Sequence, residues 1–270
     1  MTTENPTVMF HITISIDGIG ALQDELRGPH QWERTLATWH GLHNLQQTHP
    51  NLHVSVQSTI SQANAHTADE LLRTCLPMSE NYALAFASES EFYGNQGAGI
   101  AFARDRRSAI PIVTRLVEAY PVSIRHPATV LVKLFLLGEL RRLSGADTGI
   151  RCAAGAATLT LKADGSVMTC LFRSGGAFAN VRADGYDLPS LLASDKALVA
   201  CHSAAQCSQC WINCEAIPSM LQSPFAALSL MGAKRRLTRQ AEPEMVLSPQ
   251  PRLTLHTVPI EVHSQKEGRS

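Results

Sequence analysis

Cysteines are the residues of this sequence whose type and spacing most directly suggest chemistry. Six of the seven cysteines lie in one stretch; they are Cys152, Cys170, Cys201, Cys207, Cys210 and Cys214. The pair Cys207 and Cys210, separated by two residues, can place two thiolates on one ion or on one edge of a cluster. Cys214 adds a third within about one helical turn. Thiols grouped in this way either form disulfides or bind a metal.

The N-terminal sequence bears on this choice. Disulfides persist mainly in secreted proteins, which need a signal peptide. The first residues, MTTENPTVMFHITISIDG, show neither a basic start nor an apolar run before a small-residue cleavage site. We therefore predict a reducing, cytoplasmic compartment, in which closely spaced thiols most often bind a metal.

The spacing favours an iron–sulfur cluster over zinc. A zinc ribbon normally pairs two Cys-x-x-Cys knuckles, and this sequence contains one. Iron–sulfur clusters are held by four thiolates, often from scattered segments. On spacing alone, a cluster, a zinc ion and unligated thiols all stay open.

A predicted hairpin positions the first two of these cysteines. Residues 158–162 alternate as a strand, Ala163-Asp164-Gly165 is a turn signal, and residues 166–169 lead back. This hairpin would bring Cys170 beside Cys152. Trp211, next to Cys210, could shield a bound group from water, and His202 is a weak alternative ligand.

The residues before the cysteines predict an α/β fold with parallel strands. Strands are expected at residues 8–16, 52–60 and 82–88, and the near-continuous apolar character of 8–16 suggests burial of this strand on both faces. An amphipathic helix is expected after Pro29, and further helices are expected at residues 68–75, 107–119 and 126–143. The alternation of strand and helix implies parallel pairing with right-handed crossovers.

Four polar residues follow the first two predicted strands. Ser15 and Asp17 lie at the carboxyl end of the first strand, the edge at which parallel α/β proteins bind ligands. Arg27 could hold a carboxylate with its planar fork or brace a helix. Asn64 could line the same edge or cap the next helix, and Thr67 is another candidate cap.

Two groups of motifs resemble the radical SAM enzymes. The pattern Cys152-x12-Gly165-x4-Cys170, followed by a helix-like stretch and Cys207-x-x-Cys210, resembles their auxiliary-cluster domain, called SPASM or, in its shorter form, twitch. The phrases KADGSV (162–167) and FANV (178–181) support it. Upstream, ISIDG (14–18), DELRG (24–28) and STISQAN (58–64) resemble a strand, a loop and the next strand of the radical SAM barrel. The resemblance covers about residues 8–231.

The resemblance implies a fold, a ligand set and a cofactor. The implied fold is a partial (β/α) barrel over residues 1–147, an auxiliary cluster domain over residues 148–232 and a mostly irregular tail over residues 233–270, with room for a short strand in 253–262. The implied [4Fe–4S] ligands are Cys152, Cys170, Cys207 and Cys210, with Cys201 or Cys214 able to replace one of them. The implied contacts to S-adenosylmethionine are Ser15, Asp17, Arg27 and Asn64.

One departure from the family is decisive for activity. The Cys-x-x-x-Cys-x-x-Cys motif of the catalytic cluster is absent, and the one cysteine before residue 152 is Cys75, which we expect to be buried and inert in its helix. The first strands of the barrel have no counterpart, so we expect a fragment, a gene with a misplaced start codon or a degenerate relative. S-adenosylmethionine would bind only if a missing N-terminal part were supplied, for instance by a separate chain. Whether this chain is itself an enzyme stays open.

These observations predict the iron–sulfur part of a radical SAM oxidoreductase or maturase. A peptide or protein substrate is favoured because many members with this domain mature peptides, but no residue selects the substrate. The alternative is a non-catalytic partner or recognition module that binds an iron–sulfur cluster or zinc. The formal net charge of 0 and a sequence pI near 7.2 argue against nucleic acid or an anionic membrane as partner.

Overall fold

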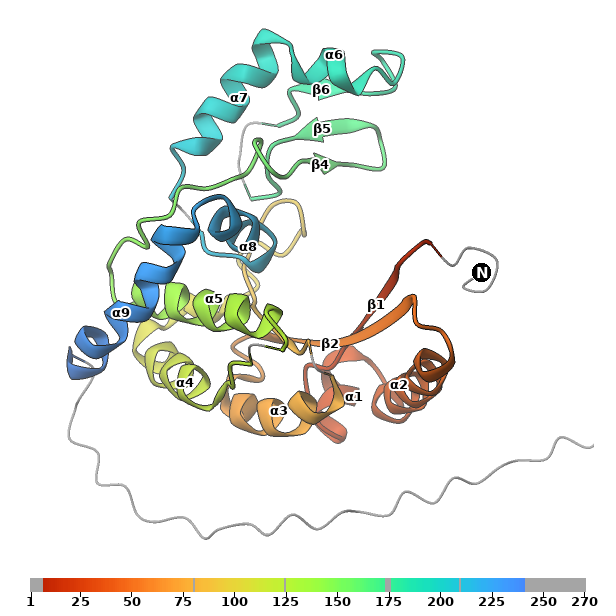
Figure 1. The fold of residues 1–270 in the computed structure, drawn as a ribbon, viewed down its shortest axis with the longest axis vertical. Coiled ribbons are helices and arrows are strands. Elements are labelled where there is room, and N and C mark those ends of the chain that lie inside the picture. Colours follow the sequence, from red (N-terminus) through yellow and green to blue (C-terminus); the bar gives the residue numbers. More distant parts are fainter. Residues whose placement is uncertain (1–6, 80, 124, 173–175, 209, 241–270) are drawn as a thin grey trace, which may run out of the picture.

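The computed structural model describes residues 7–79, 81–123, 125–172, 176–208 and 210–240, with the side chains of residues 233–240 excepted. A three-stranded parallel sheet and its helices form one end of the molecule, and a small antiparallel hairpin region forms the other (Figure 1). The predicted mixed α/β class with parallel strands is therefore confirmed. Within the described residues the sheet is open and does not close into a barrel.

The parallel sheet has the order β1-β2-β3. Its strands are β1 (Phe10–Ser15), β2 (Leu52–Ile60) and β3 (Ala83–Phe86). The β1–β2 register runs from Phe10 opposite Leu52 to Ser15 opposite Gln57, and Gln57 in turn pairs with Ala83 of β3. The carboxyl ends of β1 and β2 therefore meet at one edge, which is where the predicted polar residues lie.

Five helices surround this sheet and extend from it. They are α1 (Ala21–Arg27), α2 (Gln31–Thr48), α3 (Ala68–Cys75), α4 (Arg106–Ala119) and α5 (Ala128–Leu143). The sequence predicted all except α1, whose segment was assigned to a loop. Its helix has only seven residues and lies between Gly20 (φ 59°) and Gly28 (φ 105°), two glycines in the left-handed region that locally indicate a loop.

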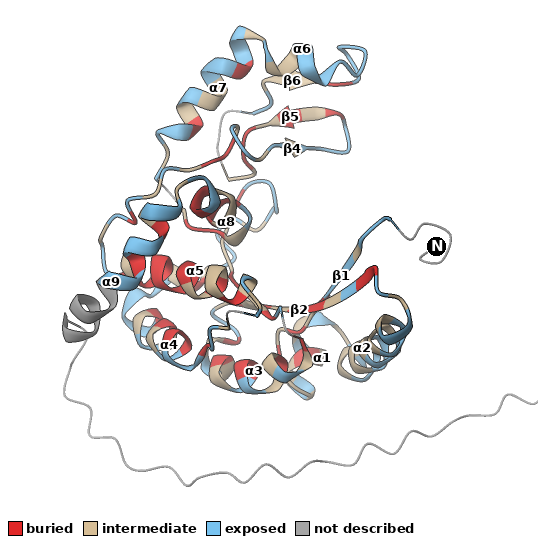
Figure 2. Ribbon diagram, in the orientation of Figure 1, coloured by how far each residue is buried: buried red, intermediate tan, exposed pale blue. Residues whose placement is uncertain are grey.

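The expectation that the first strand, β1, is buried on both faces is wrong. Its apolar Ile14 is buried, as is Val56 of β2, whereas His11, Ile12 and Thr13 are exposed. Figure 2 shows this strand projecting with much of its length exposed. On the polar face, Ser55 Oγ lies 2.8 Å from His11 Nε2 and 2.9 Å from Thr13 Oγ1. Because consecutive strand residues point to opposite faces, β1 is exposed on both faces from His11 to Thr13. This part of the strand projects beyond the elements that cover the rest of the sheet (Figure 2).

Helix α5 connects the sheet to the rest of the core. Phe135 of α5 stacks on Phe86 of β3 with ring centroids 5.8 Å apart, and on Trp211 at 6.4 Å. Lys133, the one charged residue in its apolar run, donates through Nζ to Tyr120 O at 2.9 Å and to Val117 O. The predicted buried helix is thus confirmed, with its lysine held by backbone carbonyls.

The cysteine-rich part contains the predicted hairpin. Strands β4 (Thr160–Leu161) and β5 (Ser166–Met168) pair antiparallel, and β6 (Ala179–Asn180) joins β5. Gly165 has φ +87°, the left-handed conformation that this turn requires. Helices α6 (Leu188–Leu192), α7 (Asp195–Ala205), α8 (Asn213–Gln222) and α9 (Pro224–Gln240) follow, and both α8 and α9 pack against α5.

The C-terminal tail begins later than predicted. Helix α9 continues to Gln240, whereas irregular structure was expected from residue 233. Residues 233–240, AKRRLTRQ, contain neither glycine nor proline, so nothing in their composition ends the helix. The predicted strand in 253–262 lies outside the described residues. Across the described part of the chain, no helix combines the length and the apolar character that crossing a membrane requires.

Candidate functional site

Four cysteines from separate segments line one cavity of about 310 Å³. They are Cys152, Cys170, Cys207 and Cys210, the four expected from the sequence. Cys170 is buried, the other three are half-buried, and alanine and phenylalanine side chains fill much of the remaining wall. The structure therefore brings these four residues together from stretches up to 58 positions apart in the printed sequence.

Each cysteine is positioned by its own local structure. Hairpin β4–β5 delivers Cys170, whose Sγ accepts a hydrogen bond from Phe172 N at 3.3 Å. Cys152 follows α5, and the next residue, Ala153, donates its N–H to Ser219 Oγ of α8 at 2.8 Å. Cys207 follows α7, and its backbone N–H donates a hydrogen bond to Ala204 O at 2.9 Å. Two local bonds and one tertiary bond, that of Ala153 to Ser219, thus fix the segments of Cys170, Cys207 and Cys152.

Trp211 anchors the segment that carries Cys210. Its indole is 7% exposed, and Nε1 donates to Phe135 O of α5 at 2.8 Å. The ring lies over Gly138: a Cβ placed on that glycine would be 2.3 Å from the indole. Trp211 is not among the residues that line the cysteine cavity, so its shielding of a bound group stays a prediction. Its hydrogen bond to α5 fixes the backbone next to Cys210.

Two thiols of this site have a raised pKa in the metal-free chain. The pKa of Cys210 is raised to about 12, first by burial and then by the neighbouring thiols of Cys170, Cys152 and Cys207. Burial also raises the pKa of Cys152 above its ordinary value. A thiolate-binding metal must therefore displace protons as it binds.

Cys201 and Cys214 do not line this cavity. Cys201, on α7, donates its S–H to Gly155 O at 3.1 Å. Cys214, in the first turn of α8, lines a second cavity of about 300 Å³ together with Thr59 of β2 and Phe172. His202 lies within hydrogen-bond distance of Gln206, its Nε2 3.0 Å from Gln206 Nε2.

The second cavity connects the carboxyl edge of the sheet with the cysteine region. Its wall contains Gln57 and Thr59 from β2, and Tyr93 and Asn95 from the loop after β3. Phe172 belongs to the walls of both cavities and meets the ring of Tyr93 edge-on, with centroids 5.7 Å apart. Phe172 thus lies between the sheet edge and the four cysteines, a position that its sequence context, two residues after Cys170, did not reveal.

At the sheet edge, Asp17 and Arg27 bind each other. Asp17 Oδ2 accepts from Arg27 Nε at 2.9 Å and from Nη2 at 2.5 Å, while Asp17 Oδ1 accepts from Thr59 N at 2.7 Å. Arg27 therefore holds a carboxylate, as its fork geometry suggested, but this carboxylate belongs to the chain itself. Ser15 lies half-buried at the end of β1.

Asn64 ties the ends of the two strands together and caps no helix. It is 1% exposed, and Nδ2 donates to Asp17 O at 2.7 Å and to Thr59 O at 2.8 Å. Its Oδ1 accepts from Ser61 N at 2.6 Å. Thr67 also caps no helix through its side chain; its hydroxyl donates to Asn64 O at 2.9 Å. Both capping alternatives are therefore wrong.

Gln23 is a structural residue of this edge that the sequence did not indicate. It is fully buried, and Oε1 accepts from Asp17 N at 2.9 Å and Gly18 N at 3.0 Å. Its Nε2 donates to Ser15 O at 3.3 Å. No local pattern marks this role, since it depends on the fold of α1 against the strand end.

Arg142 lines the cysteine cavity from α5 and was not predicted as a site residue. Its Nε donates to Glu139 Oε2 at 3.3 Å. Glu139 is buried, and burial raises its pKa, although Arg142 and Arg106 act in the opposite direction.

In the described residues, no three His, Cys, Asp or Glu side chains form a set that could hold a single metal ion.

Comparisons with known proteins give a remote structural likeness. No protein-family model and no curated protein matches the chain. Among solved structures, it is similar to native anSMEcpe with bound AdoMet (13% identity, TM-score 0.45, 89% of this chain and 70% of that one). It is also similar to a hexahistidine-tagged form of that protein with bound AdoMet (13% identity, TM-score 0.45, 89% and 67%). At this identity and TM-score, the function has to be inferred from the residues of this chain.

Proposed function

We propose that this chain binds a [4Fe–4S] cluster through Cys152, Cys170, Cys207 and Cys210. We further propose that it is the cluster-binding part of a radical SAM oxidoreductase or maturase. The observation that carries the first proposal is the convergence of these four thiols on one cavity of about 310 Å³. The sequence motifs that resemble the SPASM or twitch domain support the second.

The donor set fits the cluster. Four cysteine thiols are the usual ligand set of a [4Fe–4S] cluster, and the cavity offers them more room than one ion needs. Ala154, Ala204 and Phe172 line the same cavity and limit the access of water. Arg142 places a cation in the wall, which would favour bound thiolates over protonated thiols. When bound, such a cluster supplies one-electron transfer, with a potential set by charge, hydrogen bonding and exposure.

Three of the four residues predicted to contact S-adenosylmethionine, namely Asp17, Arg27 and Asn64, are bonded within the chain in this structure. Both carboxylate oxygens of Asp17, the fork of Arg27 and the amide of Asn64 hold one another and the strand ends together. We therefore assign no step to S-adenosylmethionine. A separate chain that supplies the remainder of the barrel stays part of the proposal, since the outer edge of β1 has no partner strand among the described residues.

A peptide or protein substrate is supported by the lining of the second cavity. All of its described wall residues are uncharged, and they include the amides of Gln57, Asn95 and Asn213. The amide of Gln57 can both donate and accept hydrogen bonds, which matches the backbone of a peptide, whereas the amide of Asn95 already bonds Ser90 N and Ser88 O. This cavity reaches from the sheet edge to Phe172, so a segment bound there would lie next to the cysteine cavity.

The first test measures iron, acid-labile sulfide and zinc in protein that is purified and reconstituted without oxygen. About four irons and four sulfides per chain are expected, and Cys207→Ala should lose them. Cys75→Ala is the matched control, because Cys75 is a buried cysteine outside the cavity, and its iron content should equal that of the parent. Stoichiometric zinc without sulfide would overturn the cluster and leave the alternative, a structural metal-binding module.

A further inference from the structure

A third and larger cavity lies on another side of the four cysteines. It has a volume of about 520 Å³, within the range of ordinary small-molecule sites. Cys152, Cys207, Cys210 and Arg142 belong to its wall as well as to the wall of the cysteine cavity. Neither the sequence motifs nor the proposed cluster accounts for this space.

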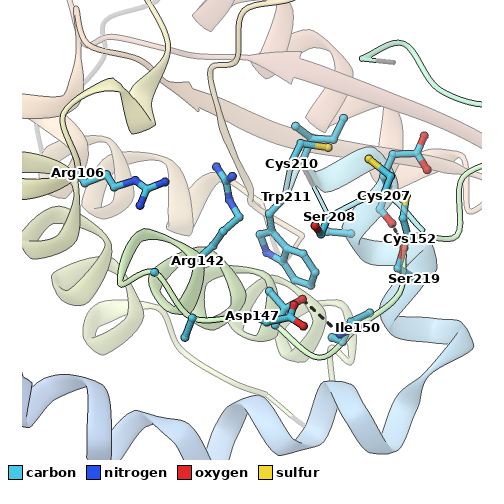
Figure 3. Close-up of a pocket in the computed structure, with 16 residues that line it drawn as sticks. Arg106, Arg142, Asp147, Ile150, Cys152, Cys207, Ser208, Cys210, Trp211 and Ser219 are labelled. Atoms are coloured by element: carbon cyan, nitrogen blue, oxygen red, sulfur yellow. Dashed lines mark hydrogen bonds between the residues drawn. The ribbon is translucent and has the colours of Figure 1, made fainter. Parts of the chain in front are cut away.

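Two arginines from different helices define one end of this cavity. Arg106 is the first residue of α4, and Arg142 lies in the last turn of α5. Figure 3 shows both side chains on one side of the cavity, with Cys152 and Cys207 on the other. The positive charges of both arginines act on the same group: each lowers the pKa of the buried Glu139, against the effect of its burial. A guanidinium is always charged and presents a fork that matches a carboxylate.

The rest of the wall mixes polar and apolar side chains. Trp211, Ile150, Ile212 and Ala216 contribute aromatic and aliphatic surface. Two acidic residues are also present, and each is engaged elsewhere. Glu215 Oε2 accepts from the hydroxyl of Thr158 at 2.6 Å, and Asp147 Oδ1 accepts from Gly149 N at 3.2 Å. A ligand with one negative end and an apolar body would match this arrangement.

We infer that this cavity binds a small monocarboxylate, with its carboxylate between Arg106 and Arg142 and its apolar body on Trp211. A dianionic phosphate suits it less well, because Asp147 and Glu215 share the wall. The inference does not depend on the cluster, since it rests on the two arginines and on the apolar side chains of Trp211, Ile150 and Ile212 in the metal-free chain.

The test is titration calorimetry of the full-length, metal-free chain with three probes. Phenylacetate carries the carboxylate and an apolar body, phenylacetamide is its neutral counterpart, and inorganic phosphate is a dianion without that body. We expect phenylacetate to give a saturable heat with one site per chain. Phenylacetamide should bind at least about tenfold more weakly, because it lacks the charge-assisted hydrogen bonds.

Variants locate the site. Arg106→Gln should weaken phenylacetate binding at least about tenfold, and it should not disturb the fold because Arg106 is exposed. Arg142→Gln should act similarly, although it also removes the partner of Glu139. Arg107→Gln is the matched control: Arg107 is exposed at the same helix start and does not line the cavity, so binding should be unchanged.

Four results would overturn the inference. They are the absence of a saturable heat with phenylacetate, binding of phenylacetamide as tight as that of phenylacetate, and binding of phosphate tighter than that of phenylacetate. The fourth is a loss of phenylacetate affinity in Arg107→Gln as large as that in Arg106→Gln. Iron analysis of the same preparations is independent of these outcomes. Failure of the carboxylate site and failure of the proposed cluster are therefore distinguishable.

Discussion

The indole of Trp211 occupies the space that a side chain at Gly138 would need. A Cβ on Gly138 would lie 2.3 Å from Cζ2 and 2.4 Å from Cε2 of the ring. The indole is further fixed by the hydrogen bond from Nε1 to Phe135 O. This contact joins the central helix α5 to the segment that carries Cys207 and Cys210, so the absence of a side chain at residue 138 bears on the geometry of the cysteine site.

Gly138→Ala is therefore expected to disturb both stability and metal binding. The added methyl group must displace the ring or helix α5, and overpacking of this kind costs about 1–3 kcal/mol. We expect a lower free energy of unfolding and a reduced iron content after anaerobic reconstitution.

Gly41→Ala in α2 provides the comparison, because a Cβ there meets nothing within 4 Å. It should retain full iron content and gain up to about 1 kcal/mol in stability from the better helix propensity of alanine. Equal stability and iron content in Gly138→Ala and the parent would contradict the role assigned to the Trp211 contact.

Much of this fold follows from local sequence. The boundaries of β2 and α3 coincide with those predicted, because the alternating apolar residues of a strand (Leu52, Val54 and Val56) and the apolar face of a helix are both local patterns. The convergence of Cys152 and Cys170 also follows from a local signal, the Ala163-Asp164-Gly165 turn. What could not be predicted depends on distant contacts.

The missed features share this physical cause. Whether β1 is covered on its two faces is decided by the elements that pack against it, which the strand sequence does not encode. The roles of Asn64, Gln23 and Phe172 depend on groups brought together by the tertiary fold. Asn64 was expected to face a ligand or to cap a helix, but a buried amide satisfies its hydrogen bonds wherever acceptors and donors are available, here at the ends of β1 and β2.

Asp17 and Arg27 should contribute unequally to stability. Asp17→Ala removes the acceptor for Thr59 N as well as the partner of Arg27, so we expect a loss of about 1–3 kcal/mol. Arg27→Gln removes only a part-exposed ion pair, since the Arg27 side chain is 40% exposed, and should cost less than about 1 kcal/mol. Urea denaturation of both variants measures this difference; equal losses would show that the link between Asp17 and the end of β2 is unimportant.

Cys75 should be the least reactive cysteine of the native chain. Its side chain is fully buried, and burial raises its pKa to about 12, so almost no thiolate exists at pH 8. Alkylation with iodoacetamide followed by peptide mass spectrometry should label the exposed Cys214 in the native protein and leave Cys75 unmodified until urea unfolds the protein. Early labelling of Cys75 in the native state would contradict its burial beneath the sheet.

Glu139 should make stability depend on pH. Burial raises its folded-state pKa above the ordinary value of 4.5, and Arg142 and Arg106 only partly oppose this. The native state therefore binds the proton more tightly than the unfolded state, so this contribution to stability is present at low pH and is lost as pH rises through the folded pKa. The Glu139→Gln variant has no carboxyl group at this position to ionise, so its stability relative to the parent should improve steadily as pH increases from about 4.5.

Urea denaturation of the parent and the variant across that pH range tests this prediction. Glu118→Gln, on the exposed surface of α4, is the control, and its difference in stability from the parent should not change with pH. A Glu139→Gln difference that is independent of pH would show that the buried carboxyl group keeps its ordinary pKa, with Arg142 fully compensating the loss of hydration.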